Sequence, residues 1–266
     1  MRIGLTSAAR VNPYATLLID ELQKRDLQVD YVLSAERGPA GDLWERLKRR
    51  GVAGALRAVR HRASAEAEPL PLAKAAWERG LNLGAPLADA CECHGIERSL
   101  VGSLSSASAA AVVRSHGTDV LINAGGGLFR QRLLKAPKLG LLNAHMARLP
   151  DLRGVDVLEW SVLLGIPLGI TVHWIDGGID TGDSLQFSPL SPQAGDTLTS
   201  LRERAVLLSA STIADQVLRL AAKPDVSKEQ EGDGESGPAD QFFALHPRLR
   251  ERAASRLAAR FGKHVD

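Results

Sequence analysis

The feature that most constrains the fold is a strand–helix–strand pattern at the start of the chain. Residues 2–6 are a short apolar run, residues 13–24 repeat apolar side chains at helical spacing, and residues 29–33 are a second apolar run. A helix between two strands is the usual connection of parallel strands, and this crossover is right-handed. The pattern therefore predicts an α/β fold, with a Rossmann-like, mostly parallel sheet flanked by helices.

The same alternation returns later in the chain. Apolar runs predict further strands at residues 97–101, 119–123, 141–144, 169–175 and 184–187. Helical spacing predicts helices at residues 107–115, 128–134, 155–164 and 197–220. Loops that follow parallel strands collect at one edge of the sheet, where folds of this kind place their sites.

The predicted domain organisation has three parts. We expect a catalytic domain over residues 1–223, a polar linker over 224–240 and a helical C-terminal tail over 241–266. The linker is too polar to bury a core of its own. Phe242, Phe243 and Leu245 are expected to dock the tail onto the domain or onto the second subunit of a homodimer.

Composition favours a cytoplasmic protein without a membrane partner. The net charge is +2, which does not require an anionic polymer as partner. No apolar run approaches the about 20 residues that cross a bilayer, and residues 1–5 lack the apolar core of a signal peptide.

The two cysteines, Cys91 and Cys93, offer no disulfide framework. One residue separates them, whereas structural zinc sites usually place about two to four between paired cysteines. No second pair of ligands lies nearby, so no metal is expected.

A basic stretch lies within a segment of helical character, residues 42–90. Seven residues from Arg46 to Arg62 are Lys or Arg. The stretch could hold a phosphate-bearing substrate, although most charge runs of this kind are solvated helix faces.

Three polar residues at the ends of predicted strands suggest a site. Asn143 and His145 are two apart on an extended segment, so both can face one pocket. Asp180 lies in a glycine-rich loop directly after the strand that carries His173. Each residue alone has an ordinary structural explanation, as a bonded histidine, a turn former or a cap. Together they favour a functional site.

A second glycine-rich loop, residues 124–130, follows the strand at 119–123. Its glycines can bring backbone groups close to a ligand. The spacing is not that of a dinucleotide-binding loop, and none follows the first strand either, which argues against NAD or FAD.

The order of these motifs resembles the 10-formyltetrahydrofolate-dependent formyltransferase family. Asn143-Ala-His145 is followed by a Leu-Pro loop ending in Arg153-Gly154, and then by a strand and Ile175-Asp-Gly-Gly178. The family includes methionyl-tRNA, glycinamide ribonucleotide and sugar-nucleotide formyltransferases. The resemblance is strongest over residues 119–190.

The resemblance implies roles for particular residues. The family's catalytic Asn, His and Asp correspond to Asn143, His145 and Asp180. The backbone that holds the pterin of 10-formyltetrahydrofolate corresponds to Gly127, Leu128, Phe129, Arg130, Ile175, Asp176, Gly177 and Gly178. Contacts to the acceptor are also expected of Arg153 and His173, and of Arg148, which departs from the family pattern.

One departure from the family pattern lies near the acceptor side. Members usually have a serine after the catalytic histidine where this chain has Ala147, and Arg148 follows. The absent hydroxyl puts the identity of the acceptor in question more than the reaction.

The residue types suit formyl transfer. An amine attacks the formyl carbon and forms an oxyanion, to which Asn143 and a protonated His145 could donate hydrogen bonds. His145, titrating near neutrality, could move the amine proton, and Asp180 would favour its charged form.

The leading hypothesis is N-formylation of a small-molecule amine, such as a nucleotide-linked amino sugar or another biosynthetic intermediate. A tRNA acceptor is less favoured, because only the short tail follows the linker where the tRNA enzyme carries a β-barrel domain. Hydrolysis of 10-formyltetrahydrofolate is a further alternative. A folate- or nucleotide-binding protein without catalysis would be expected to lack one of the three catalytic residues.

Overall fold

The computed structural model describes residues 1–35, 70–223 and 240–261. The basic stretch at 46–62 and the linker up to residue 239 lie outside these ranges, so the expectations for them are not tested.

A seven-stranded sheet forms the centre of the molecule, in the order β3-β2-β1-β4-β5-β7-β8. The strands are β1 Ile3–Ser7, β2 Tyr31–Ser34, β3 Glu97–Leu100, β4 Val120–Asn123, β5 Gly140–His145, β7 Gly169–Trp174 and β8 Ser184–Pro189. The first five in this order pair in parallel, which confirms the mostly parallel sheet. β7 and β8 run antiparallel to their neighbours, a reversal that the apolar runs do not reveal.

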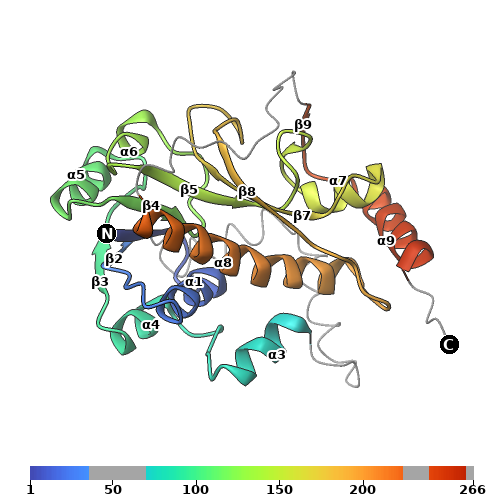
Figure 1. The fold of residues 1–266 in the computed structure, drawn as a ribbon, viewed down its shortest axis with the longest axis horizontal. Coiled ribbons are helices and arrows are strands. Elements are labelled where there is room, and N and C mark those ends of the chain that lie inside the picture. The colour runs from blue at the N-terminus through green and yellow to red at the C-terminus, as the bar shows by residue number, and fades with distance from the viewer. Residues whose placement is uncertain (36–69, 224–239, 262–266) are drawn as a thin grey trace.

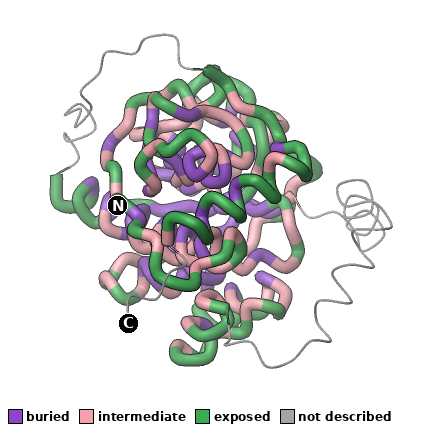
Figure 2. Tube along the Cα trace, turned by 90° about the vertical axis from the view of Figure 1, so that its right-hand side faces the viewer, coloured by how far each residue is buried: buried purple, intermediate pink, exposed green. Residues whose placement is uncertain are grey.

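Helices cover both faces of the sheet (Figure 1). One face is covered by α1 Pro13–Gln23, α4 Leu87–Cys93 and α8 Leu198–Ala222, with α3 Pro71–Glu78 packed on α8. The other face carries α5 Ala107–Ser115 and α6 Gln131–Leu134. Alternate residues of one strand enter the two cores: Val32 packs with α1, while Leu33 packs with α5. Buried residues accordingly gather between the outer helices (Figure 2).

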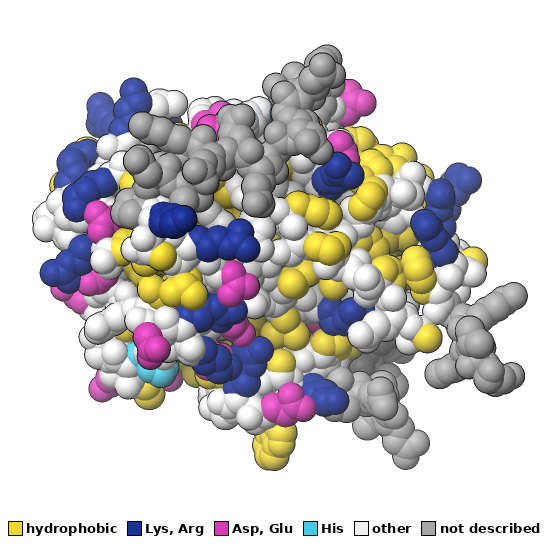
Figure 3. Space-filling model, viewed as in Figure 1, with side chains coloured by type: hydrophobic (Ala, Val, Ile, Leu, Met, Phe, Trp, Pro, Cys, Tyr) yellow, Lys and Arg dark blue, Asp and Glu magenta, His cyan; other side chains and the backbone are white. Residues whose placement is uncertain are grey.

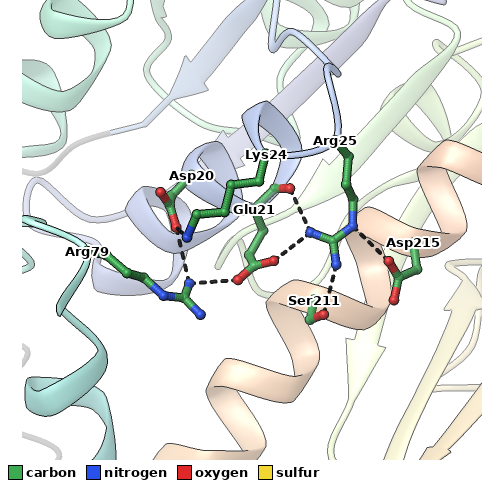
Figure 4. A network of polar contacts seen from close by, with 7 residues as sticks. All are labelled: Asp20, Glu21, Lys24, Arg25, Arg79, Ser211 and Asp215. Carbon is green, nitrogen blue, oxygen red and sulfur yellow. Dashed lines mark hydrogen bonds and ion pairs between the residues drawn. The ribbon is translucent and has the colours of Figure 1, made fainter.

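A network of ion pairs ties α1, α3 and α8 together (Figure 4). Glu21 on α1 is buried and accepts from Arg25 and Arg79, each at 2.6 Å. Arg25 in turn pairs with Asp215 of α8 at 2.7 Å. Burial would raise the pKa of Glu21, but the hydrogen bonds from the two guanidinium groups outweigh it and hold the pKa below its usual value.

The C-terminal tail folds back onto the domain. β9, Gln241–Phe242, pairs in parallel with β6, Arg153–Gly154. β6 lies in a segment predicted as a loop. Phe242 lies 5.0 Å from the ring of Trp160, and Leu245 is buried. Phe243 does not dock onto the domain: its side chain is 70% exposed, because neighbouring residues of an extended segment point in opposite directions. Docking of Phe243 onto a second subunit stays a prediction.

The remaining part of the tail is α9, Pro247–Phe261, the predicted helix. α9 lies beside α7, Val157–Leu164, at the end of the molecule opposite the N-terminus (Figure 1). Ala253 and Leu257 of α9 are buried in a core shared with α7 and α8. The tail is therefore packed against the domain.

Within the described residues, α8 is the one helix long and apolar enough to cross a membrane by length and composition. Half of its most apolar window is buried in this fold, and α8 packs against α1 and the sheet, as a core helix does. On the face that α8 crosses, hydrophobic side chains lie among charged ones (Figure 3).

Candidate active site

β5 and β7 place three of the predicted site residues side by side. Asn143 and His145 lie two apart on β5, and antiparallel pairing sets His173 of β7 opposite Asn143. The side-chain nitrogen Nδ2 of Asn143 is 3.1 Å from Nε2 of His173. The β7–β8 register shifts at Val172 and His173, a bulge of the kind often found beside active sites.

Asp180 completes the cluster from the loop that follows β7. One of its carboxylate oxygens is 3.5 Å from Nδ1 of His145, and the other is 3.7 Å from Nε2 of His173. The first oxygen also accepts the backbone N–H of Gly154 at 2.9 Å. The structure thus brings Asn143, His145 and Asp180 together.

The reason for this convergence differs from the one inferred from strand ends. β7 is antiparallel, so its last residue lies near the start of β5, where Ile175 N–H donates to the carbonyl of Leu141. The loop must fold back to bring its carboxylate to the histidines. Asp180 has a left-handed backbone, with φ of 51°, a conformation that Asp tolerates better than most residues.

Two backbone groups of the 152–154 segment belong to the cluster and were missed by sequence reasoning. The carbonyl of Leu152 lies 2.7 Å from Nε2 of His145, and Gly154 binds Asp180 through its N–H. Backbone groups leave no signature in residue types. The single available signal was Gly154 itself, whose φ of 106° favours glycine.

Both histidines are buried, and burial lowers their pKa values. His145 is 5% exposed, and desolvation outweighs the opposing effects of Asp180 and the Leu152 carbonyl. Burial and the neighbouring His145 lower the pKa of His173 to about 4. The pKa of His145 is therefore lowered from its ordinary value, although Asp180 favours the charged form as expected.

The orientation of His145 also corrects the expected role of its ring. Nε2 faces the Leu152 carbonyl, and Nδ1 faces the Asp180 carboxylate. Both ring nitrogens thus point at oxygen acceptors, so neither ring nitrogen is free to donate to a substrate oxyanion in this arrangement. The separation of 3.5 Å on the Nδ1 side is longer than a normal hydrogen bond, and a small polar atom could bridge it.

The two loops assigned to the pterin approach one another. A Cβ added to Gly177 would lie 2.9 Å from the side-chain Nε2 of Gln131, directly after the first loop. Gly127 has φ of 75° with open space beside it, and Leu128 is 78% exposed. Among the other assigned residues, Arg130, Asp176 and Gly178 are exposed, whereas Phe129 and Ile175 pack partly against the α5 core.

The residues assigned to the acceptor differ in their exposure. Arg148 is exposed, 3.8 Å from Asp151, while His173 is buried within the cluster. The Nε atom of Arg153 is buried and has no hydrogen-bond partner among the described residues. Ala147 is fully buried with Leu152, so a hydroxyl on its side chain would point into the core rather than toward an acceptor.

A cavity of about 210 Å³ lies elsewhere, between α7 and α9. None of the predicted site residues lines it. In the described ranges, no group of three His, Cys, Asp or Glu side chains is placed to hold a metal ion, and the expectation that none is needed stays a prediction.

The lowered pKa of His173 predicts a pH-dependent stability. Between pH 6.5, the ordinary pKa, and about 4, the unfolded chain binds more protons than the folded one. The stabilisation is complete above this window and is lost as the pH falls through it. Urea unfolding should show the free energy of unfolding of wild type falling more steeply here than that of His173→Gln, which does not titrate. Parallel profiles would contradict this origin.

Several solved structures share the α/β fold of this chain. Solved structures that share it include glycinamide ribonucleotide transformylase 1 from Symbiobacterium toebii, at 19% identity and a TM-score of 0.57, covering 84% of this chain and 88% of that one. A sugar N-formyltransferase from Shewanella sp FDAARGOS_354 is 14% identical, with a TM-score of 0.54, covering 97% and 88%. At these identities the likeness shows the fold alone.

The family assignment comes from sequence. The family model described as formyl transferase matches residues 59–217, more than half of the chain. This chain belongs to the formyl transferase family, as the motifs indicated. A methionyl-tRNA formyltransferase from Ruminiclostridium cellulolyticum is 31% identical over 145 residues, which are 53% of this chain and 46% of that protein. The chain spans about half or less of the length of the curated relatives it matches.

Proposed function

We propose that this protein transfers the formyl group of 10-formyltetrahydrofolate to the amine of a small-molecule acceptor. The observation that carries the proposal is the convergence of an amide, two imidazoles and a carboxylate, whose polar atoms contact one another at 3.1 to 3.7 Å. The chain that carries them belongs to the formyl transferase family. This is the set of groups that acyl transfer to an amine requires: an oxyanion donor and a proton carrier with an orienting carboxylate.

The reaction proceeds by addition and elimination. The acceptor nitrogen forms a bond to the formyl carbon, whose oxygen becomes an oxyanion. The bond from that carbon to N10 of the folate then breaks, and N10 takes up the proton that the amine loses. Tetrahydrofolate and the formamide are the products, and no covalent enzyme intermediate is needed.

Asn143 is the proposed oxyanion donor. One of its amide hydrogens is directed at His173, which leaves the second without a partner among the described residues. Asn143 is half-buried, so this N–H acts where water competes little. A single donor of this kind is typically worth about 3 kcal/mol in the transition state.

His145 is the proposed proton carrier, and Asp180 is the carboxylate proposed to orient it. Burial favours the neutral form of His145, whose Nδ1 can accept the amine proton through a small polar group that bridges the 3.5 Å gap to Asp180. The charged ring would then donate to Asp180 on one side and to the Leu152 carbonyl on the other. Both contacts strengthen as positive charge develops, which stabilises the transition state more than the ground state.

The pterin is proposed to lie between the backbone of residues 127–130 and that of residues 175–178. Their mutual approach at Gln131 and Gly177 places two exposed, glycine-containing loops close together. No metal takes part in this proposal.

The candidate functions differ in the acceptor of the formyl group. The curated relatives are named methionyl-tRNA formyltransferase, so the amine of a charged tRNA is the second candidate. Water as acceptor would make the protein a hydrolase. A cytoplasmic location agrees with each of these and stays a prediction.

The decisive experiment follows tetrahydrofolate by absorbance in parallel reactions. The acceptor arms are nucleotide-linked amino sugars, simple primary amines, methionyl-tRNA and buffer alone. The proposal expects release that depends on a small amine, with the matching formamide found by mass spectrometry. Equal release in buffer alone would assign hydrolysis, release with tRNA alone would assign the second candidate, and no release in any arm would reject the reaction.

Arg148 is proposed to contact an anionic group of the acceptor. Its guanidinium is half-exposed and forms a 3.8 Å ion pair with Asp151. We expect Arg148→Ala to raise the acceptor KM about tenfold, the equivalent of one charge-assisted hydrogen bond, with kcat nearly unchanged. Arg252→Ala, on the exposed side of α9, is the matched control. An unchanged acceptor KM removes Arg148 from this role.

A further inference from the structure

A row of polar side chains crosses four neighbouring strands at one level of the sheet. Register places Thr6 of β1 opposite Asn123 of β4, and Asn143 of β5 opposite His173 of β7. The pairing of Ile122 with Leu142 sets Asn123 beside Asn143. Laterally paired residues point to the same face, so Asn123 shares the face of the proposed catalytic residues.

The row is connected by hydrogen bonds that run in one direction. The N–H of Gly125 donates to Oδ1 of Asn123 at 3.0 Å, and Nδ2 of Asn123 donates to Oδ1 of Asn143 at 3.1 Å. Nδ2 of Asn143 then meets Nε2 of His173 at 3.1 Å. The other ring nitrogen of His173 lies 2.8 Å from the carbonyl of Trp174.

The groups at the two ends of this row of hydrogen bonds allow one arrangement of donors and acceptors. A backbone N–H can only donate and a backbone carbonyl can only accept. Gly125 therefore requires the oxygen of the Asn123 amide on its side, and Trp174 requires a proton on Nδ1 of His173. Nε2 of His173 is then an acceptor, which matches the amide nitrogen of Asn143. Reversing either amide would oppose like groups.

We propose that Asn123 is a positioning residue that holds the Asn143 amide with its N–H₂ side toward the reacting formyl oxygen. Asn123 does so by donating to Asn143 Oδ1, which prevents the amide from rotating by half a turn. The same row of hydrogen bonds keeps His173 in its neutral, Nδ1-protonated form. The kinetic part of this inference rests on the proposed function, whereas the tautomer of His173 does not.

Asn123→Asp tests the proposal with almost no change of shape. The carboxylate still accepts the Gly125 N–H, but it has no hydrogen to give to Asn143 Oδ1. The Asn143 amide is expected to rotate so that its N–H₂ group donates to residue 123. The Asn143 oxygen then faces His173 and the substrate. His173 must then carry a proton on Nε2.

The first readout is nitrogen-15 NMR of the His173 ring. In the wild type, Nε2 should resonate as an unprotonated, pyridine-type nitrogen and Nδ1 as a protonated one. In Asn123→Asp, Nε2 should shift to the protonated, pyrrole-type position. An unchanged His173 signal in a folded variant would overturn the proposed chain, whatever the enzyme's acceptor.

The second readout is kinetic, with any amine that supports turnover. Asn123→Asp should lower kcat about a hundredfold, as loss of an oxyanion donor does, with little change in the KM for 10-formyltetrahydrofolate. Asn123→Leu frees the amide without repelling its oxygen, so its loss of kcat should be smaller. Equal losses in both variants would overturn the orienting role.

A matched control separates the charge from the position. Asn82 is exposed, and its Oδ1 accepts the N–H of Gly84 at 3.2 Å, the same local turn that Asn123 makes with Gly125. Asn82→Asp should leave kcat and the His173 spectrum unchanged. If the wild type transfers no formyl group at all, the proposed function fails, while the NMR comparison still decides the chain of amides.

Discussion

Alanine in place of Asn143 is expected to lower the rate of tetrahydrofolate release by about two orders of magnitude or more, with the protein still folded. The variant removes the one amide N–H proposed to meet the oxyanion. Asn143 is half-buried, so water can enter the space that its truncation leaves. This water can hydrogen-bond to Asn123 and His173, the partners that lose Asn143. Stability should therefore suffer much less than turnover.

The same size of loss is expected for His145→Ala, for a different reason. This variant leaves no group to move the amine proton, and general acid–base catalysis typically contributes about 10² to 10⁴. Steady-state kinetics should show lower kcat, and thermal unfolding should verify the fold. Asn82→Ala is the matched control on an exposed loop. Near-normal release by either site variant would contradict the proposed site.

The second large effect is expected from Gly154→Ala, a change outside the three proposed catalytic residues. A Cβ at this position would lie 2.0 Å from the carbonyl oxygen of Phe242, and φ of 106° is strained for alanine. Residues 153–154 and the tail must then separate. We expect a loss of about 2 kcal/mol or more in the free energy of unfolding.

Activity should fall with it, because Gly154 N–H also holds Asp180, and Leu152 two residues earlier holds His145. A displacement of about 1 Å at such a site can lower the rate about a hundredfold. The measurement is kcat together with urea unfolding and limited proteolysis of the tail.

The control for this prediction is Gly195→Ala. Gly195 also has a positive φ, of 80°, but a Cβ there meets no atom within 4 Å. Its variant should lose about 1 kcal/mol from backbone strain and keep normal turnover. If Gly154→Ala behaves in the same way as Gly195→Ala, the contact with the tail has no role in the site.

These expectations give the tail a place in the proposed chemistry. Phe242 and Leu245 pack on the domain, and the N–H of Leu245 donates to Asp156 at 2.9 Å. Arg250 of α9 bonds to Asp156 and to the buried Glu159 of α7. Residues about 90 positions later in the chain thus bind next to the segment that carries the Leu152 and Gly154 backbone groups.

The sequence by itself determined the kind of fold and most of its elements. Apolar periodicity depends on nearest neighbours along the chain, so the helix at residues 107–115 and the helical character of the tail could be predicted. Family membership also followed from sequence, because Asn143-x-His145 and the loop before Asp180 are local patterns. The spacing of two residues was enough to place Asn143 and His145 on one face.

Tertiary structure decided what no local pattern encodes. The antiparallel direction of β7 depends on where a strand finds its partner, so the position of Asp180 could not be derived from strand ends. The protonation of His145 depends on burial, which opposes its charged form more strongly than the nearby carboxylate favours it. The support from Leu152, Gly154 and Phe242 consists of backbone contacts between distant segments, and backbone groups are the same for almost every residue type.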